Sequence, residues 1–169
     1  MHIHITGASG SGTSTLGAEL AAKLNAVHAD ADDHYWLPTE TPYQSKRPKR
    51  ERLAGVVAVL KHHERTVTSG SVSGWGIALE EMFDLVVFLY VPTDIRIERL
   101  RAREAAQLGK VDEAFLTWAS QYDVGPPEGR SLEKHRAWLN EIACPVLEIV
   151  GDTTVAERMQ AVIKYLSNI

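Results

Sequence analysis

The sequence predicts an α/β fold in which a mostly parallel sheet is covered by helices on both faces. Short apolar runs alternate with longer amphipathic stretches along the 169 residues, and this alternation is typical of strand–helix–strand units. The strongest apolar run, residues 85–91, shows no polar alternation, which indicates a strand buried on both faces. A glycine-rich turn joins the first strand-like run to the first helical run. The chain length suits a single domain.

The individual elements follow from hydrophobic periodicity and from capping signals. Short apolar runs predict strands over residues 3–6, 26–29, 66–68, 85–91 and 146–150. Helices are expected over residues 14–24, 48–63, 77–83, 94–107, 111–122 and 132–143, and from Thr153 or Thr154 to about residue 168. Ser131 precedes the sixth of these helices and should cap it. Residues 31–47, which contain Pro38 and Pro42, are expected to form a loop.

Composition and charge restrict the possible partners. The net charge is −4 and the isoelectric point is about 6.0, which disfavours general binding of nucleic acid or of anionic membranes. The chain enters a strand at once, so no signal peptide is expected. The longest apolar run, residues 85–91, is far too short to span a bilayer. We therefore expect a cytoplasmic protein, either a monomer or a homodimer, with no membrane partner.

The glycine-rich turn has the spacing of a phosphate loop, G-x-x-x-x-G-K-[ST], but threonine stands where the lysine belongs. A loop of this kind, followed by a helix N-terminus, presents backbone N–H groups to an anion. The hydroxyl after the lysine position is the one that would ligate Mg²⁺. The expected phosphate-binding residues are Gly7, Ala8, Ser9, Gly10, Ser11, Gly12, Thr13, Ser14 and Thr15.

Thr13 leaves two alternatives open, because a threonine donates a hydrogen bond but carries no charge. Either binding and transfer of a triphosphate are weakened, or another cation replaces the lysine. Two clusters of cations could supply it: Lys46, Arg47, Lys49, Arg50 and Arg52, and then Arg96, Arg99, Arg101, Arg103 and Lys110. On a helix, Arg96, Arg99 and Arg103 share one face, and at least one of them is expected to contact phosphate.

Polar and glycine-rich segments follow four of the expected strands, at residues 7–14, 30–33, 69–71 and 92–94. Ligands of parallel sheets bind at the carboxyl ends of the strands, so these segments predict one composite site. Asp30, Asp32 and Asp33 are expected to form a metal or acceptor site there, with Mg²⁺ as the ion, and the alternative is a helix-capping role. Farther along, the aromatic ring of Trp75 between two glycines suits a pocket rim, and Arg130 and His135 are candidates to face the site.

The stretches "GASGSGTST", "HADADDHYWLP", "VTSGSVSGWG" and "FDLVVFLYVPTDIRIERLRARE" resemble the P-loop kinases of the adenylate kinase and shikimate kinase group. The small bacterial adenylate kinase-like proteins related to topology modulators are especially similar. The resemblance implies a three-layer P-loop NTPase fold with a five-stranded parallel sheet in the order 2-3-1-4-5. It also implies ATP and Mg²⁺ as cofactors, an acceptor pocket after the second strand and a mobile lid after the fourth.

The same resemblance assigns roles to individual residues. Asp30, Asp32, Arg99 and Arg103 are the expected catalytic residues, since the two carboxylates would hold the metal and orient the acceptor while the arginines would neutralise the moving phosphoryl group. Ser14 and Asp30 are the expected metal ligands. The expected acceptor-binding residues are Asp33, Arg47, Gly70 and Trp75.

We therefore expect one kinase-like domain over residues 1–169, with an acceptor-binding insert at about residues 31–63 and a short lid at about residues 104–130. The leading hypothesis is an ATP-dependent phosphotransferase whose partner is a nucleoside monophosphate or a hydroxyl metabolite. The alternative is a nucleotide-binding regulatory protein that has lost phosphoryl transfer. A third hypothesis, a factor that acts on DNA conformation, is disfavoured by the net negative charge.

Overall fold

A computed structural model describes residues 1–40, 45–126 and 128–168. Parts of two expected features, residues 41–44 of the acceptor insert with Pro42 and residue 127 of the lid, lie outside the described residues. The strands are β1 (His2–Gly7), β2 (Val27–Asp30), β3 (Thr66–Ser69), β4 (Leu85–Tyr90) and β5 (Val146–Val150). The helices are α1 (Thr13–Leu24), α2 (Ala31–Tyr35), α3 (Lys49–His62), α4 (Ile77–Glu80), α5 (Thr93–Leu108), α6 (Glu113–Ser120), α7 (Leu132–Glu141) and α8 (Val155–Leu166).

The five strands form one parallel sheet in the order β2-β3-β1-β4-β5, which confirms the predicted fold class and strand order. The register aligns the carboxyl ends of the strands, since Asp30 pairs with Ser69, Ser69 pairs with Ile5, and Gly7 pairs with Leu89. The residues that follow β1, β2 and β3 therefore emerge at the same edge of the sheet.

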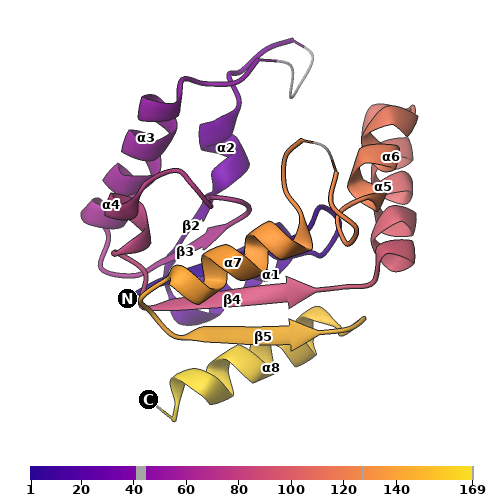
Figure 1. Cartoon of the computed structure of the whole chain (residues 1–169). Helices are drawn as coiled ribbons and strands as arrows, with labels where there is room; N and C mark the ends of the chain where they lie inside the picture. Colours follow the sequence, from indigo (N-terminus) through magenta and orange to yellow (C-terminus); the bar gives the residue numbers. More distant parts are fainter. Residues whose placement is uncertain (41–44, 127, 169) are drawn as a thin grey trace.

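Helices cover both faces of the sheet, as its apolar strands require (Figure 1). On one face α1 and α8 pack on the sheet, and Leu16 and Val162 are fully buried there. On the other face α3, α4 and α7 bury Leu60 and Leu79 around β4. The helices α5 and α6 form a separate small cluster beyond the tip of the β4 arrow. That pair stands at the edge where the strands end.

A buried histidine lies within the second of these layers. His4 of β1 is fully buried, stacks on Phe83 with ring centroids 4.8 Å apart and meets the edge of Trp138 at 6.0 Å. Burial lowers the pKa of His4 to about 3, so the ring is neutral at physiological pH. His4 thus behaves as an aromatic core residue of the folded protein.

The expectation of an unbroken loop over residues 31–47 is wrong at its start, where the short helix α2 begins. The Oδ1 atom of Asp30 accepts a hydrogen bond from the backbone N–H of Asp32 at 3.0 Å and so caps α2. Acidic residues in the first turn also suit the helix dipole. Such a short helix leaves little periodic signal in the sequence. The prolines that follow it therefore led to the prediction of a loop.

Candidate functional site

The turn between β1 and α1 adopts the expected anion-receptive shape. Gly10 and Gly12 have φ angles of +83° and +89°, a region that residues with a Cβ rarely adopt. Gly12 is the N-cap of α1, and within the described chain no side chain caps this helix end. The N–H groups of the first turn are therefore available to an anion. The side chain of Ser14 is exposed in that turn, where it could contact a phosphate or its metal.

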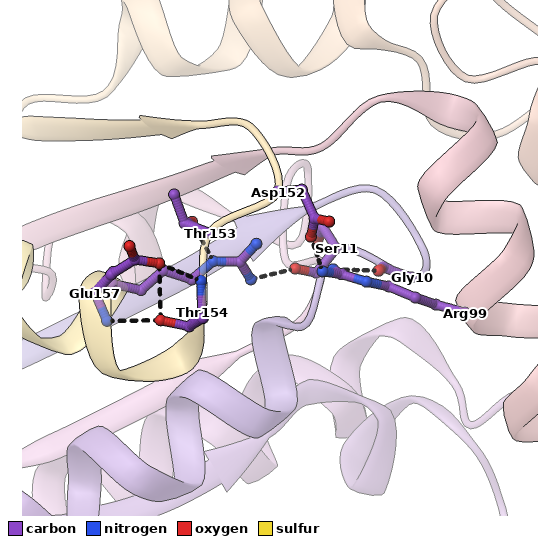
Figure 2. Close-up of polar contacts among 8 residues, drawn as sticks. Gly10, Ser11, Arg99, Asp152, Thr153, Thr154 and Glu157 are labelled. Atoms are coloured by element: carbon purple, nitrogen blue, oxygen red, sulfur yellow. Dashed lines mark hydrogen bonds and ion pairs between the residues drawn. The ribbon is translucent and has the colours of Figure 1, made fainter.

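Three successive carbonyl groups on the outer side of this turn each accept a hydrogen bond from a different arginine. Arg96 Nη1 donates to the Ser9 oxygen at 3.2 Å, and Arg99 Nη1 donates to the Gly10 oxygen at 3.5 Å. Arg158 Nη1 donates to the Ser11 oxygen at 2.6 Å. Arg99 also pairs with Asp152, and Figure 2 shows its side chain between Gly10 and Asp152. Guanidinium groups from α5 and α8 thus surround the turn.

Arg96 is one of three arginines of which at least one was expected to contact phosphate, and its guanidinium is engaged by protein backbone. Its side chain is fully buried and donates to the backbone oxygens of Val91 and Ala119 as well as to Ser9. The α5 face that carries Arg96 packs on the turn and on α6, so this guanidinium lies behind the loop. Periodicity placed the arginines on one helical face correctly, but it could not indicate which part of that face is buried.

The acidic residues after β2 have different environments. Asp30 is held by two hydrogen bonds, because Oδ1 caps α2 and Oδ2 accepts from Ser69 Oγ at 3.2 Å. The pKa of the Asp32 carboxyl is raised, first because surrounding protein displaces water and then because Asp30 is nearby. Positive charges of Arg130 and Arg103 act in the opposite direction. The raised pKa of Asp32 makes its carboxylate a better proton acceptor than an ordinary aspartate.

Arg130 connects the phosphate side of the site with the acidic side. Its Nη2 atom donates to Ser9 Oγ at 3.1 Å, and its guanidinium lies 5.8 Å from the ring centre of Trp118. Burial lowers its pKa, while the charge of Asp32 is the largest influence that raises it. His135, the other residue considered with it, is buried and hydrogen-bonded through Nδ1 to Tyr122 at 2.8 Å. Only Arg130 of this pair faces the loop.

The other predicted site residues differ in exposure and in their contacts. Arg103 and Asp33 are exposed on α5 and α2. Gly70 has a φ of +104°, and an added Cβ would lie 3.1 Å from the Cβ of Ala31, so backbone approaches closely there. Arg47 donates to the Trp36 oxygen at 3.5 Å and pairs with Glu51 at 3.9 Å. These contacts engage Arg47 within the insert itself.

Trp75 is half-buried and packs against the apolar cluster beneath α3 and α4. Its ring stacks against Tyr35 with centroids 6.2 Å apart. Arg52 lies over the same tyrosine, with its guanidinium carbon 3.9 Å from the ring centre. The side chains of Tyr35 and Arg52 in the insert thus pack against each other and against Trp75.

Arg158 is the residue that sequence reasoning missed. It lies 147 positions from Ser11, to which it donates, and no short spacing links the two segments. A weak signal was present in the capping box of Thr154 and Glu157, which fixes the start of α8 directly before Arg158. Figure 2 shows the reciprocal contacts of Thr154 and Glu157 beside the turn. This pattern predicts where a helix starts, but it does not predict that Arg158 contacts Ser11.

Two features of the described residues concern metal binding and membranes. No three His, Cys, Asp or Glu side chains in the described chain gather as they would around a protein-held metal. Mg²⁺ does not require such a cluster, since it is bound through one or two protein oxygens together with phosphates and water. The hydroxyl of Ser14 and the carboxylate of Asp30 offer oxygen donors of that kind. None of the helices described is long and apolar enough to cross a bilayer.

The sheet order, the turn after β1 and the helices on both faces define the P-loop kinase fold. Solved structures agree over nearly the whole chain. Shikimate kinase from Acinetobacter baumannii in complex with shikimate has a TM-score of 0.60 at 19% identity, with 99% of this chain and 93% of that chain covered. A gluconokinase from Sinorhizobium meliloti 1021 has a TM-score of 0.61 at 16% identity, with 99% and 91% covered. At these identities the likeness concerns the fold.

A family model described as an AAA domain matches residues 3–114, and the chain belongs to this family. It is also similar to the uncharacterized protein YqaC of Bacillus subtilis (strain 168). The two are 45% identical over 177 residues, which cover 99% of this chain and 98% of the relative.

Proposed function

We propose that the protein is a phosphotransferase that moves the γ-phosphoryl group of ATP to a small acceptor. The observation that carries this proposal is the position of Arg130, which donates to Ser9 in the phosphate loop and whose charge acts on Asp32. A cation between a phosphate cradle and a basic carboxylate suits phosphoryl transfer, which depends on positioning and charge neutralisation.

A hydroxyl acceptor suits this arrangement better than a phosphate acceptor. Transfer to a hydroxyl forms a bond between the acceptor oxygen and the γ-phosphorus, breaks the bond to the β–γ bridging oxygen and releases ADP and one proton. Asp32, whose pKa is raised, would accept that proton. A phosphate acceptor needs no such base. The solved shikimate kinase and gluconokinase, which share the fold, are named for hydroxyl compounds.

Other residues would bind ATP and the acceptor and would neutralise the charge of the phosphates. The loop N–H groups would hold the ATP phosphates, and Arg99, Arg103 and Arg130 would offset charge on the transferring group. Ser14 and Asp30 would hold Mg²⁺, which supplies further neutralisation of the phosphates when bound. Asp33 and Arg47 of the insert, together with Gly70 and Trp75 after β3, would bind the acceptor.

The proposal is tested by screening pools of sugars, hydroxy acids and nucleoside monophosphates with ATP and Mg²⁺. ADP formation is followed, and the phosphorylated product is identified by mass spectrometry. We expect turnover with one hydroxyl compound and a loss of about 100-fold or more in kcat for Asp32→Asn. Glu141→Gln, which alters an exposed carboxylate at the end of α7, is the matched control and should keep full activity.

Two outcomes would change the proposal. Turnover with a nucleoside monophosphate that survives Asp32→Asn would exclude the hydroxyl acceptor. Tight ATP binding without transfer to any acceptor would contradict phosphoryl transfer and support the nucleotide-binding regulatory alternative.

A further inference from the structure

Two buried arginines, Arg96 and Arg158, place positive charge next to the loop that lacks the lysine. Arg96 is 0% exposed and Arg158 is 2% exposed. Both donate to carbonyl groups of the phosphate loop, at Ser9 and Ser11. An added Cβ on Gly12 would lie 3.0 Å from Arg158 Nη1. The guanidinium of Arg158 is therefore in contact with the Ser11–Gly12 peptide, two residues before Thr13.

Within the described residues, these two buried charges have no carboxylate at ion-pair distance. Among the described residues, neither Arg96 nor Arg158 forms an ion pair within 4.0 Å. Arg96 reaches Asp123 only through the hydroxyl of Thr93. The charges of Asp123 and Asp152 act on Arg96 and Arg158 from beyond contact distance. Burying a charge without a counterion in contact costs free energy. A bound anion in front of the loop would offset that cost.

Arg99 and the cations of the insert are less suited to this role. Arg99 pairs with Asp152, so much of its charge is already offset. Arg47 pairs with Glu51 and donates to the backbone of its own segment. Arg96 and Arg158 donate to carbonyl groups of the loop and have no carboxylate within 4.0 Å in the described chain. Arg130 also lacks such an ion pair there, but it donates to the side chain of Ser9 and its charge acts on Asp32.

Residues at the start of α8 hold the side chain of Arg158 in place. The capping box of Thr154 and Glu157 sets the first turn of the helix. The Nε atom of Arg158 then donates to Thr153 Oγ1 at 2.9 Å, which turns Nη1 toward Ser11. Three short-range contacts thus fix a charge next to a segment far away in the sequence.

We propose that Arg158, assisted by Arg96, supplies from behind the phosphate loop the positive charge that Thr13 does not, so that the loop binds polyphosphate through its backbone. The guanidinium groups hold the loop carbonyls outward, which directs the N–H groups inward, and their charges act across a poorly hydrated peptide layer. Arg158 is a positioning residue in this scheme, because it touches the loop and not the phosphates. The inference rests on the proposed phosphate-binding function and names the source of its charge.

The test is a double-mutant cycle between positions 158 and 13, with pyrophosphate binding measured by calorimetry. Arg158→Met should weaken pyrophosphate binding by about tenfold or more. Thr13→Lys should restore most of this loss in the Arg158→Met background, yet change the wild-type affinity by less than about threefold. Arg158→Lys, which keeps the charge, should stay within about threefold of wild type. Arg65→Met removes an exposed charge at the opposite end of β3 and should leave the affinity unchanged.

Three results would overturn the proposal. The first is pyrophosphate binding by Arg158→Met equal to that of Arg65→Met, the second is an equal gain from Thr13→Lys in both backgrounds, and the third is no binding by the wild type. If Arg158→Met does not fold, Thr13→Lys in the wild type decides, and a gain above about 30-fold would show that the charge was not already supplied. Phosphoryl transfer is assayed separately. Charge-dependent pyrophosphate binding without transfer would refute the proposed function alone, and transfer without dependence on Arg158 would refute this inference alone.

Discussion

Gly10→Ala tests how tightly the phosphate loop is held against α5. Gly10 has a φ of +83°, and a Cβ built there would lie 2.7 Å from the backbone oxygen of Arg96 and 3.0 Å from Leu100 Cγ. The nearest atom belongs to helix backbone and cannot rotate away as a side-chain end could. The substitution must therefore move the loop or the helix.

The expected cost has two parts. A left-handed conformation costs an alanine roughly 1–2 kcal/mol, and forcing an extra carbon into a packed site costs about 1–3 kcal/mol. Together they give about 2–5 kcal/mol, which corresponds to a fall in Tm of roughly 4–20 °C for a chain of this size. Gly109→Ala is the matched control, because Gly109 has a φ of +67° with nothing within 4 Å of its added Cβ. It should lose only the conformational part, about 1–2 kcal/mol.

The two variants are compared by thermal unfolding, followed by pyrophosphate titration at a temperature where both are folded. We expect Gly10→Ala to melt at least about 2 °C below Gly109→Ala and to lose pyrophosphate affinity, while Gly109→Ala binds as the wild type does. Equal melting temperatures and equal affinities would refute the claim that contact with α5 holds the loop in its binding shape.

Three further predictions concern the cap, the base and the buried histidine. Thr154→Ala removes the capping box of α8 and should cost about 1 kcal/mol, or roughly 2–4 °C in Tm, whereas Thr117→Ala on an exposed helix face should cost less than about 0.5 kcal/mol. Because the pKa of Asp32 is raised from its usual 3.8, the acidic limb of kcat/KM should lie at a higher pH than an ordinary aspartate gives, and Asp32→Asn should remove this limb; a limb that persists would exclude Asp32 as the base. His4 has a pKa of about 3 in the fold and 6.5 when unfolded, so the unfolded chain alone takes up the proton as pH falls, and His4 should lower the free energy of unfolding by about 1 kcal/mol between pH 6.5 and 5.5. Denaturant titrations of wild type and His4→Phe measure this, and identical slopes with pH would contradict it.

Local sequence signals predicted most of the fold. Apolar runs placed the strands, and residues 146–150 match β5 at both ends. Ser131 and Thr154 cap α7 and α8 as their positions before helical stretches indicated. These features depend on neighbouring residues, which is why the sequence reveals them. The strand order came from the family resemblance, since pairing between distant strands leaves no local pattern.

The site was predicted only in part because its key contacts join distant segments. The loop was located from its glycine spacing, and the acidic residues were located from their position after β2. Helical periodicity could not show that Arg96 turns inward, since packing of α5 against the loop decides that. Nor could any spacing connect Arg158 with Ser11. The sequence therefore indicated the glycine-rich turn and included Arg96 among the candidate cations, but it did not indicate Arg158.

The central claim is that this loop binds a polyphosphate although Thr13 occupies the lysine position. Calorimetric titration of the wild-type protein with ATP and with adenosine, each with and without Mg²⁺, tests it most directly. We predict that ATP binds at least about tenfold more tightly than adenosine, because the loop N–H groups and the arginines behind them contribute only when phosphates are present. Equal affinities for ATP and adenosine, or no binding of ATP, would contradict the account.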